Sequence, residues 1–238
     1  MNKKQKQLID TYFRKREIVA GVNSGDLDSH ENHHLMKQGK KPILGSVNSD
    51  TVDLVFDPTL INKKSFNHMR GHNVAIVLQY HPQLINKLPI EKMDDHSITY
   101  LIINQPSLVD KLPLDKLGGY GIRKILQNQP TLINKLSIEK LNPFGVTKIL
   151  QFQPSLVDKL PIQLLDGGDI GFVLTHQPSL INKLPIEKMN GNNLRFLLAN
   201  QPSLINKLPI EKLDIDNIGV VLWKHPHLRP KFEERGLI

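Results

Sequence analysis

Pro202-Ser203-Leu204-Ile205-Asn206-Lys207-Leu208-Pro209-Ile210-Glu211-Lys212-Leu213 is the stretch that decides the fold, because close relatives of it recur along the chain. The full copies open at Pro58, Pro82, Pro106, Pro130, Pro154, Pro178 and Pro202, and a broken copy opens at Pro226. Each step is 24 residues long, without insertion or deletion. Self-similarity at a fixed period of this size predicts a solenoid of stacked repeats.

The last full copy predicts three helical pieces. Pro202 suits the first turn of a short helix, where its missing N–H costs nothing, and Pro209 ends that helix. A single-turn piece follows Pro209, and then a turn with good N-cap residues. Ile218, Val221 and Leu222 lie at i, i+3 and i+4 and predict a third, longer helix. The predicted fold class is therefore all-α, a right-handed α-solenoid of seven 24-residue repeats, each with a short helix, a single-turn helix and a longer helix.

Eight apolar positions recur in each copy. One unit of this size cannot bury eight apolar side chains by itself, whereas stacked neighbours can, so the sequence predicts one continuous core whose stability is a sum of nearest-neighbour contributions. In the second copy the eight residues are Leu84, Ile85, Leu88, Ile90, Met93, Ile98, Leu101 and Ile102.

The pattern divides the chain into five segments. The predicted segments are a basic amphipathic helix (1–20), a flexible linker (21–41), a degenerate N-terminal cap (42–57), the array (58–225) and a C-terminal cap (226–238). The first helix could dock on the array, on a partner or on an anionic surface. The two caps are expected because the outermost repeats would otherwise expose the ends of the core.

Composition restricts the classes of function. The chain has no cysteine, so disulfides, thiolate nucleophiles and cysteine-ligated metals are excluded. No apolar run approaches the roughly 18 residues that span a bilayer, and the N-terminus lacks the apolar stretch of a secretory signal. We therefore expect a cytoplasmic protein, or a virion component if it is phage-encoded. The net charge of +8 favours an anionic partner only weakly, since the charge is concentrated in the first 16 residues and spread thinly along the array.

Catalysis and metal binding find little support in the pattern. His30, His33 and His34 form the one metal-like cluster, but they lie in the predicted linker, where no fixed frame would hold an ion. Glycine-rich phosphate loops, nucleophile elbows and converging acid–base groups are missing, and recurring Glu and Lys are equivalent by repetition, whereas an active site needs unlike groups at one place. We expect a non-enzymatic protein without a metal, a cofactor or a small-molecule ligand.

The repeat resembles two known α-solenoid families. Its plan of two short helical pieces and one longer helix in 24 residues is similar to the leucine-rich repeat variant family. Its Pro-x-Leu-Ile/Val opening, after a helix with paired leucines, is similar more distantly to the mitochondrial transcription terminator repeat. The resemblance covers residues 58–225. The chain lacks the Arg-rich and Ala-rich helix of the first family and has shorter repeats than the second, so the resemblance implies a fold and transfers no function.

Specificity is expected where the copies differ. The turn after each constant stretch and the outer positions of the third helix change from copy to copy, which is what a modular reader of a protein or nucleic-acid ligand needs. Drift after duplication would produce the same variation in the turns. The candidate partner-binding residues are Tyr100, Arg123, Lys124, Lys148, Phe172, Arg195, Phe196, Trp223 and Lys224.

Two rows of lysines could instead bind a nucleic acid. A phosphate backbone could follow the first row, Lys87, Lys111, Lys135, Lys159, Lys183 and Lys207. The second row is Lys92, Lys116, Lys140, Lys188 and Lys212, with Leu164 in the fifth copy. An acidic row lies beside them: Glu91, Asp115, Glu139, Glu187 and Glu211, with Asp110 and Asp158. This mixture favours inter-repeat ion pairs over a phosphate track.

The sequence therefore favours a non-enzymatic repeat scaffold that binds another protein, or assembles into a larger complex, along one face of the solenoid. The alternative is a nucleic-acid-binding repeat protein that uses the lysine rows and the variable third-helix residues. The richness in Asn, Lys and Ile without Cys is compatible with a bacterial or phage origin.

Overall fold

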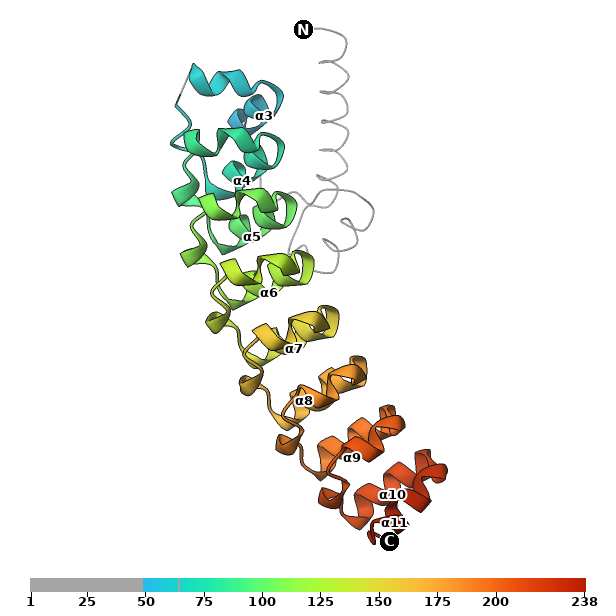
Figure 1. The fold of residues 1–238 in the computed structure, drawn as a ribbon. Coiled ribbons are helices and arrows are strands. Elements are labelled where there is room, and N and C mark those ends of the chain that lie inside the picture. The colour runs from blue at the N-terminus through green and yellow to red at the C-terminus, as the bar shows by residue number, and fades with distance from the viewer. Residues whose placement is uncertain (1–48, 64) are drawn as a thin grey trace, which may run out of the picture. The chain divides into compact units, whose positions relative to one another are not determined.

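The computed structural model describes residues 49–63 and 65–238, and this part of the chain is helical without a β-strand (Figure 1). The predicted N-terminal helix, the linker with His30, His33 and His34, and the first half of the predicted N-terminal cap lie outside the described residues. Within them, the first element is helix α3 (Ser49–Phe56). The prediction of an all-α chain built from regularly repeating helical pieces is confirmed for this part.

Ten-residue α-helices form the regular series of the described chain, and each begins 24 residues after the one before. Every helix from α4 to α9 packs against its predecessor and its successor, as the succession of ribbons in Figure 1 shows. The series is α4 (Gly71–Tyr80), α5 (Asp95–Asn104), α6 (Gly119–Asn128), α7 (Pro143–Phe152), α8 (Gly167–His176), α9 (Gly191–Asn200) and α10 (Ile215–Lys224).

The shorter pieces of the described chain are 3₁₀-helices, one in the first copy and two in each later full copy. The opening proline begins the first piece, and the residue before the next proline is extended, as at Leu208 (φ −102°, ψ 148°). The first pieces are η1 (Pro58–Asn62), η2 (Pro82–Lys87), η4 (Pro106–Lys111), η6 (Pro130–Lys135), η8 (Pro154–Lys159), η10 (Pro178–Asn182) and η12 (Pro202–Lys207). The second are η3 (Ile90–Lys92), η5 (Leu114–Lys116), η7 (Ile138–Lys140), η9 (Ile162–Leu164), η11 (Ile186–Lys188) and η13 (Ile210–Lys212). The chain closes with η14 (Pro226–Leu228) and α11 (Arg229–Glu234).

The longer helix begins earlier than the sequence pattern predicts. The stretch predicted as a four-residue turn contributes only its first residue as the N-cap, and the other three form the first helical turn. The side chain of Asn142 accepts a hydrogen bond from the Gly145 amide at 2.7 Å, and Asp214 accepts one from Asn217 at 2.7 Å. Such caps satisfy an amide that the helix itself leaves without a partner, and so they fix its start.

Most of the eight apolar positions form a continuous core. In the third copy, Leu108, Val109, Leu112, Leu117, Ile122, Ile125 and Leu126 are all buried. The fourth position differs, because Leu114 and its equivalents up to Ile186 are half-buried at the edge of the core. At the C-terminal end, Phe232 of α11 is fully buried and adds to the same core.

Glutamine residues join neighbouring repeats. The side-chain amide of Gln153, which lies just before an opening proline, donates to the main-chain oxygen of Gln127 at 3.0 Å, and Gln177 donates to Gln151 at 2.9 Å. Gln105, Gln129 and Gln201 make the same contact, each 26 residues back. Because each bond reaches a fixed position in the preceding helix, an inserted residue would break it. This accounts for a period without insertions.

Close backbone approach further fixes the spacing of the helices. A Cβ atom added to Gly119, the first residue of α6, would lie 2.4 Å from the main-chain oxygen of Lys140 in the next copy. The equivalent Gly191 would meet the oxygen of Lys212 at 2.8 Å. Both distances are too short for any side chain, so the absence of a Cβ allows the next copy to pack this closely.

Candidate interaction face

The ten-residue helices α4 to α9 bury the same positions. In α6 the fourth, seventh and eighth residues, Ile122, Ile125 and Leu126, are buried. The second, sixth and tenth positions lie on another side of the helix, since residues four apart share a face. These outer positions, not the constant 3₁₀ segments, carry the chemical variety of the array.

Cations and aromatic rings interleave on this side of α5 to α8. The guanidinium carbon of Arg123 lies 4.9 Å from the ring centre of Tyr120 and 5.6 Å from that of Phe144 in the next helix. The ammonium of Lys148 lies 5.0 Å from the ring centre of Phe172, one helix further along. We call this the cation–aromatic face, and it consists of His96, Tyr120, Arg123, Lys124, Phe144, Lys148 and Phe172.

Two cations of this face, Arg123 and Lys148, have amide partners instead of carboxylates. Arg123 donates to Gln127 Oε1 at 3.3 Å and Lys148 to Gln151 Oε1 at 3.1 Å. The salt bridges found among the described residues lie elsewhere. Burial, with the neighbouring charge of Arg123, lowers the pKa of Lys124. The face therefore carries positive charge that an anionic ligand would stabilise.

Several aromatic rings of this side remain open to solvent. Tyr120 is 47% exposed and Phe144 is 57% exposed, which is unusual for large apolar side chains in a chain with only 5% aromatic residues. Phe152 and Phe196, also on outer helix positions, are comparably exposed. Exposed aromatic residues beside arginine are typical of the central residues of protein interfaces.

The predicted partner-binding residues do not all share this face. Arg123, Lys124, Lys148 and Phe172 come together there, and half-buried Arg195 and exposed Phe196 lie on α9. Exposed Trp223 and Lys224 lie on α10.

The prediction for Tyr100 is wrong. Its ring is only 8% exposed, and its hydroxyl donates to Gln79 Oε1 of the preceding helix. Burial also raises the pKa of Tyr100. Its place between two helices makes it part of the core.

Sequence reasoning missed three members of the face. His96, Tyr120 and Phe144 fall in the stretches predicted as turns, whereas the structure places them in the first turn of α5, α6 and α7. The signal was present in the N-cap residues, because a cap at Asp94 or Asn142 implies that the helix begins at the next residue.

The first lysine row joins neighbouring repeats. Lys135 pairs with Asp110 and Lys183 with Asp158, each 25 residues earlier. Lys87 donates to Asn62 at 2.8 Å, and Lys159 donates to Asn134 at 3.3 Å. The predicted inter-repeat ion pairs are thus confirmed for Asp110 and Asp158. Lys111 and Lys207 occupy the equivalent exposed positions.

The second row uses the backbone, not the neighbouring acidic row. Lys140 donates to the main-chain oxygens of Asp115 at 2.7 Å and Leu117 at 2.9 Å, and Lys188 donates to those of Gln163 and Leu165. Lys116 and Lys212 make the same pair of contacts. The prediction that this acidic row pairs with lysines is wrong here, because the ammonium group instead satisfies carbonyls that the short 3₁₀ turn leaves without a partner.

Two further observations concern other kinds of site. In the part of the chain that the structure describes, no three His, Asp or Glu side chains lie close enough together to hold a metal ion. None of the helices described is both long enough and apolar enough to cross a membrane.

Comparison of the chain with protein-family models, with curated proteins and with solved structures finds no match.

Proposed function

We propose that this chain is a non-enzymatic repeat scaffold, a right-handed α-solenoid of seven 24-residue repeats, that binds an extended acidic segment of another protein along its cation–aromatic face. The observation that carries the proposal is the convergence of three cations without a carboxylate partner, Arg123, Lys124 and Lys148, on aromatic rings of three successive helices. Acidic side chains would pair with the cations, and apolar side chains would pack on the open rings.

The dimensions of the face support an extended ligand. The face covers four successive helices, α5 to α8. At an interaxial distance of about 9 Å, an extended peptide of roughly eight residues matches its length. Variable residues at one position per helix would then read successive parts of the ligand.

A protein ligand fits these observations better than a nucleic acid. A phosphate backbone needs a row of available cations, and most lysines of the two rows are engaged in contacts with the preceding repeat. On the outer side, α5 has Thr99 and Tyr100 where α6 has Arg123 and Lys124, so the positive charge is local. The scaffold would act in the cytoplasm, or in a virion if the chain is of phage origin.

The test compares the binding of two labelled probes. One is a peptide of roughly eight residues made of Glu, Gly and Tyr, and the other is single-stranded poly(U). Fluorescence anisotropy measures both affinities at about 50 mM and 200 mM salt. We expect the peptide to bind, with weaker affinity at the higher salt concentration, and poly(U) to bind more weakly than the peptide. Tight poly(U) binding with a steep salt dependence and no peptide binding would instead support the nucleic-acid alternative. If neither the peptide nor poly(U) binds, both the protein-binding proposal and the nucleic-acid alternative are refuted.

A further inference from the structure

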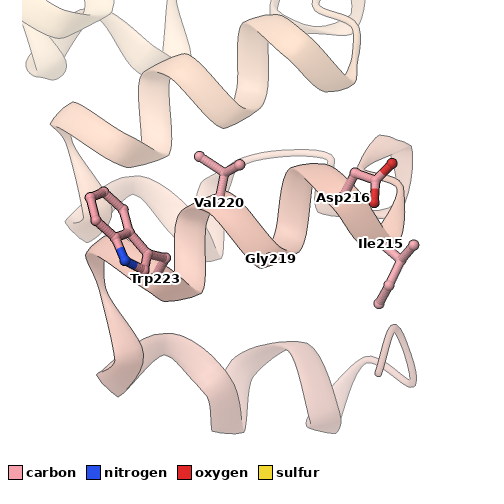
Figure 2. A pocket seen from close by; sticks show the side chains of 5 residues that line it. All are labelled: Ile215, Asp216, Gly219, Val220 and Trp223. Carbon is pink, nitrogen blue, oxygen red and sulfur yellow. The ribbon is translucent and has the colours of Figure 1, made fainter.

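Helix α10 presents an exposed apolar surface of its own. Trp223 is 85% exposed, Ile215 is 66% exposed and Val220 is 42% exposed. Together with Asp216 and Gly219 these residues line a shallow, open hollow along the helix (Figure 2). Exposed large apolar side chains that adjoin one another mark an interaction surface more often than a passive one.

This surface corresponds to the side of each earlier helix that the next repeat covers. The first, fifth and ninth residues of the earlier helices face their successor: Gly119 approaches the Lys140 oxygen, Thr147 donates to Asp169 at 3.3 Å, and Gln127 donates to the Lys148 oxygen at 3.2 Å. The equivalent residues of α10 are Ile215, Gly219 and Trp223. A Cβ atom added to Gly219 would meet nothing within 4 Å, so this side of α10 is open in the described chain.

The residues of this surface are arranged symmetrically about its centre. Ile215 lies four residues before Gly219, and Trp223 lies four residues after it. In the adjacent row, Asp216 lies four residues before Val220, and Lys224 lies four residues after it. Each row therefore has a small or medium-sized residue at its centre. The first row has an apolar side chain at both ends, whereas the second has opposite charges at its ends.

We propose that α10 pairs antiparallel with α10 of a second copy of this chain, about a two-fold axis that passes near Gly219 and Val220. Such an axis reverses the direction of the helix but keeps each row facing the same row of the partner. Ile215 then packs on the partner's Trp223, and Asp216 pairs with the partner's Lys224. The absence of a side chain at Gly219 allows the two helices to approach closely at the axis.

Charge favours this arrangement over the stacking of a parallel copy. A parallel pair in register would place Asp216 beside the partner's Asp216 and Lys224 beside the partner's Lys224, and like charges at close range repel. An antiparallel pair opposes unlike charges, and it also opposes the helix dipoles. Because a two-fold interface uses the same surface on both subunits, the assembly closes as a dimer and does not extend into a filament. The proposal does not depend on the cation–aromatic face.

Sedimentation equilibrium of the full chain tests the pairing. We expect a reversible dimer, and Trp223→Ala and Asp216→Lys should each raise the dimer dissociation constant roughly tenfold or more. The double variant Asp216→Lys/Lys224→Asp should recover most of the loss, because it restores unlike charges across the axis. Phe196→Ala, which removes an exposed ring from α9, is the matched control and should leave the dissociation constant unchanged.

Cysteine cross-linking tests the geometry, because the natural chain contains no cysteine. Under mild oxidation Val220→Cys, next to the axis, should form a covalent dimer, whereas Phe196→Cys should form no disulfide-linked dimer under the same conditions. All substituted side chains are exposed, so circular dichroism should show unchanged helix content. A wild-type chain that stays monomeric at about 100 μM would overturn the proposal. So would a ladder of higher oligomers, or a dimer that neither Trp223→Ala nor Asp216→Lys weakens.

Discussion

Among single residues, the lysines of the second row show how one side chain stabilises the junction between repeats. Lys140 and Lys188 each donate to two main-chain oxygens of the preceding copy. In the copy between them the same position is Leu164, which is 42% exposed. The natural sequence thus contains one junction in which no lysine ammonium group from this position can reach the equivalent main-chain oxygens, those of Glu139 and Leu141.

Leu164→Lys should stabilise the chain. The new ammonium group would reach the oxygens of Glu139 and Leu141, as Lys140 and Lys188 reach theirs, while an exposed apolar side chain is removed. We expect the free energy of unfolding to rise by about 0.5–1.5 kcal/mol in urea titrations. The reciprocal variant Lys188→Leu should lower it by a similar amount. A neutral or destabilising Leu164→Lys would mean that these contacts contribute nothing.

The cap residue Asp94 predicts a dependence of stability on pH. Burial raises the pKa of this carboxyl, but hydrogen bonds from Ser97, the nearby His96 and the Asp94 amide together outweigh that effect, and the net pKa is lowered. A lowered pKa in the folded state stabilises the protein above the ordinary value near 3.8, and this contribution is lost as pH falls through the lower, folded-state pKa.

The isosteric variant Asp94→Asn keeps the cap but does not titrate. We expect the difference in unfolding free energy between wild type and Asp94→Asn to be constant from about pH 5 to pH 7. Below about pH 4 the wild type should lose stability relative to Asp94→Asn. The loss should be less than about 1 kcal/mol, because the side chain is exposed. Urea midpoints measured along this series check it. A difference that does not change with pH would contradict the assigned role of the carboxylate.

Single residues were also where sequence reasoning was least reliable. Tyr100 and Phe172 occupy the same outer position of their helices, yet one is buried against Gln79 and the other takes part in the cation–aromatic face. The partner of an ammonium group was equally hard to predict, because a main-chain oxygen of the preceding copy leaves no mark in the sequence. Proximity of Lys and Glu in the sequence therefore gave the wrong partner for the second row.

Among the helical elements, prediction worked well because their causes are local. The i, i+3, i+4 spacing of apolar residues predicted the longer helix, and the prolines predicted where the short pieces begin and end. The start of the longer helix was predicted three residues too late, since its first turn contains polar or glycine residues in most copies. Asn142 and Asp214 carried the missing information as N-caps.

Leu156→Asp tests the assignment of the core at the level of one element. Leu156 is 7% exposed in η8, and an aspartate there would place an unpaired charge in the continuous core. We expect a loss of about 3 kcal/mol or more in the free energy of unfolding, which thermal and urea denaturation can measure. Ser155→Asp, which adds the same charge at the neighbouring exposed position, should change it by less than about 0.5 kcal/mol. Equal effects of the two variants would show that the core is wrongly assigned.

For the whole molecule, constant positions form a frame, and variable positions form the cation–aromatic face. Glutamine and lysine bonds to the preceding repeat and the apolar core explain the constant positions. The periodicity predicted the constant positions and the apolar core, but not the bonds of the glutamines and lysines to main-chain oxygens. The cation–aromatic face could be predicted only as a set of variable positions, because the closeness of Arg123 to Phe144 depends on how neighbouring helices stack.

The most direct test of this separation compares two triple variants that change the net charge equally. Arg123→Glu/Lys124→Glu/Lys148→Glu reverses the cations of the cation–aromatic face, and Lys111→Glu/Lys159→Glu/Lys207→Glu reverses three lysines of the first row. The measurement is the dissociation constant of the labelled acidic peptide at about 50 mM salt. We expect affinity for the peptide to fall roughly tenfold or more for the first variant and less than about twofold for the second, because the peptide binds the cation–aromatic face. Equal losses, or a greater loss for the second variant, would contradict this binding site.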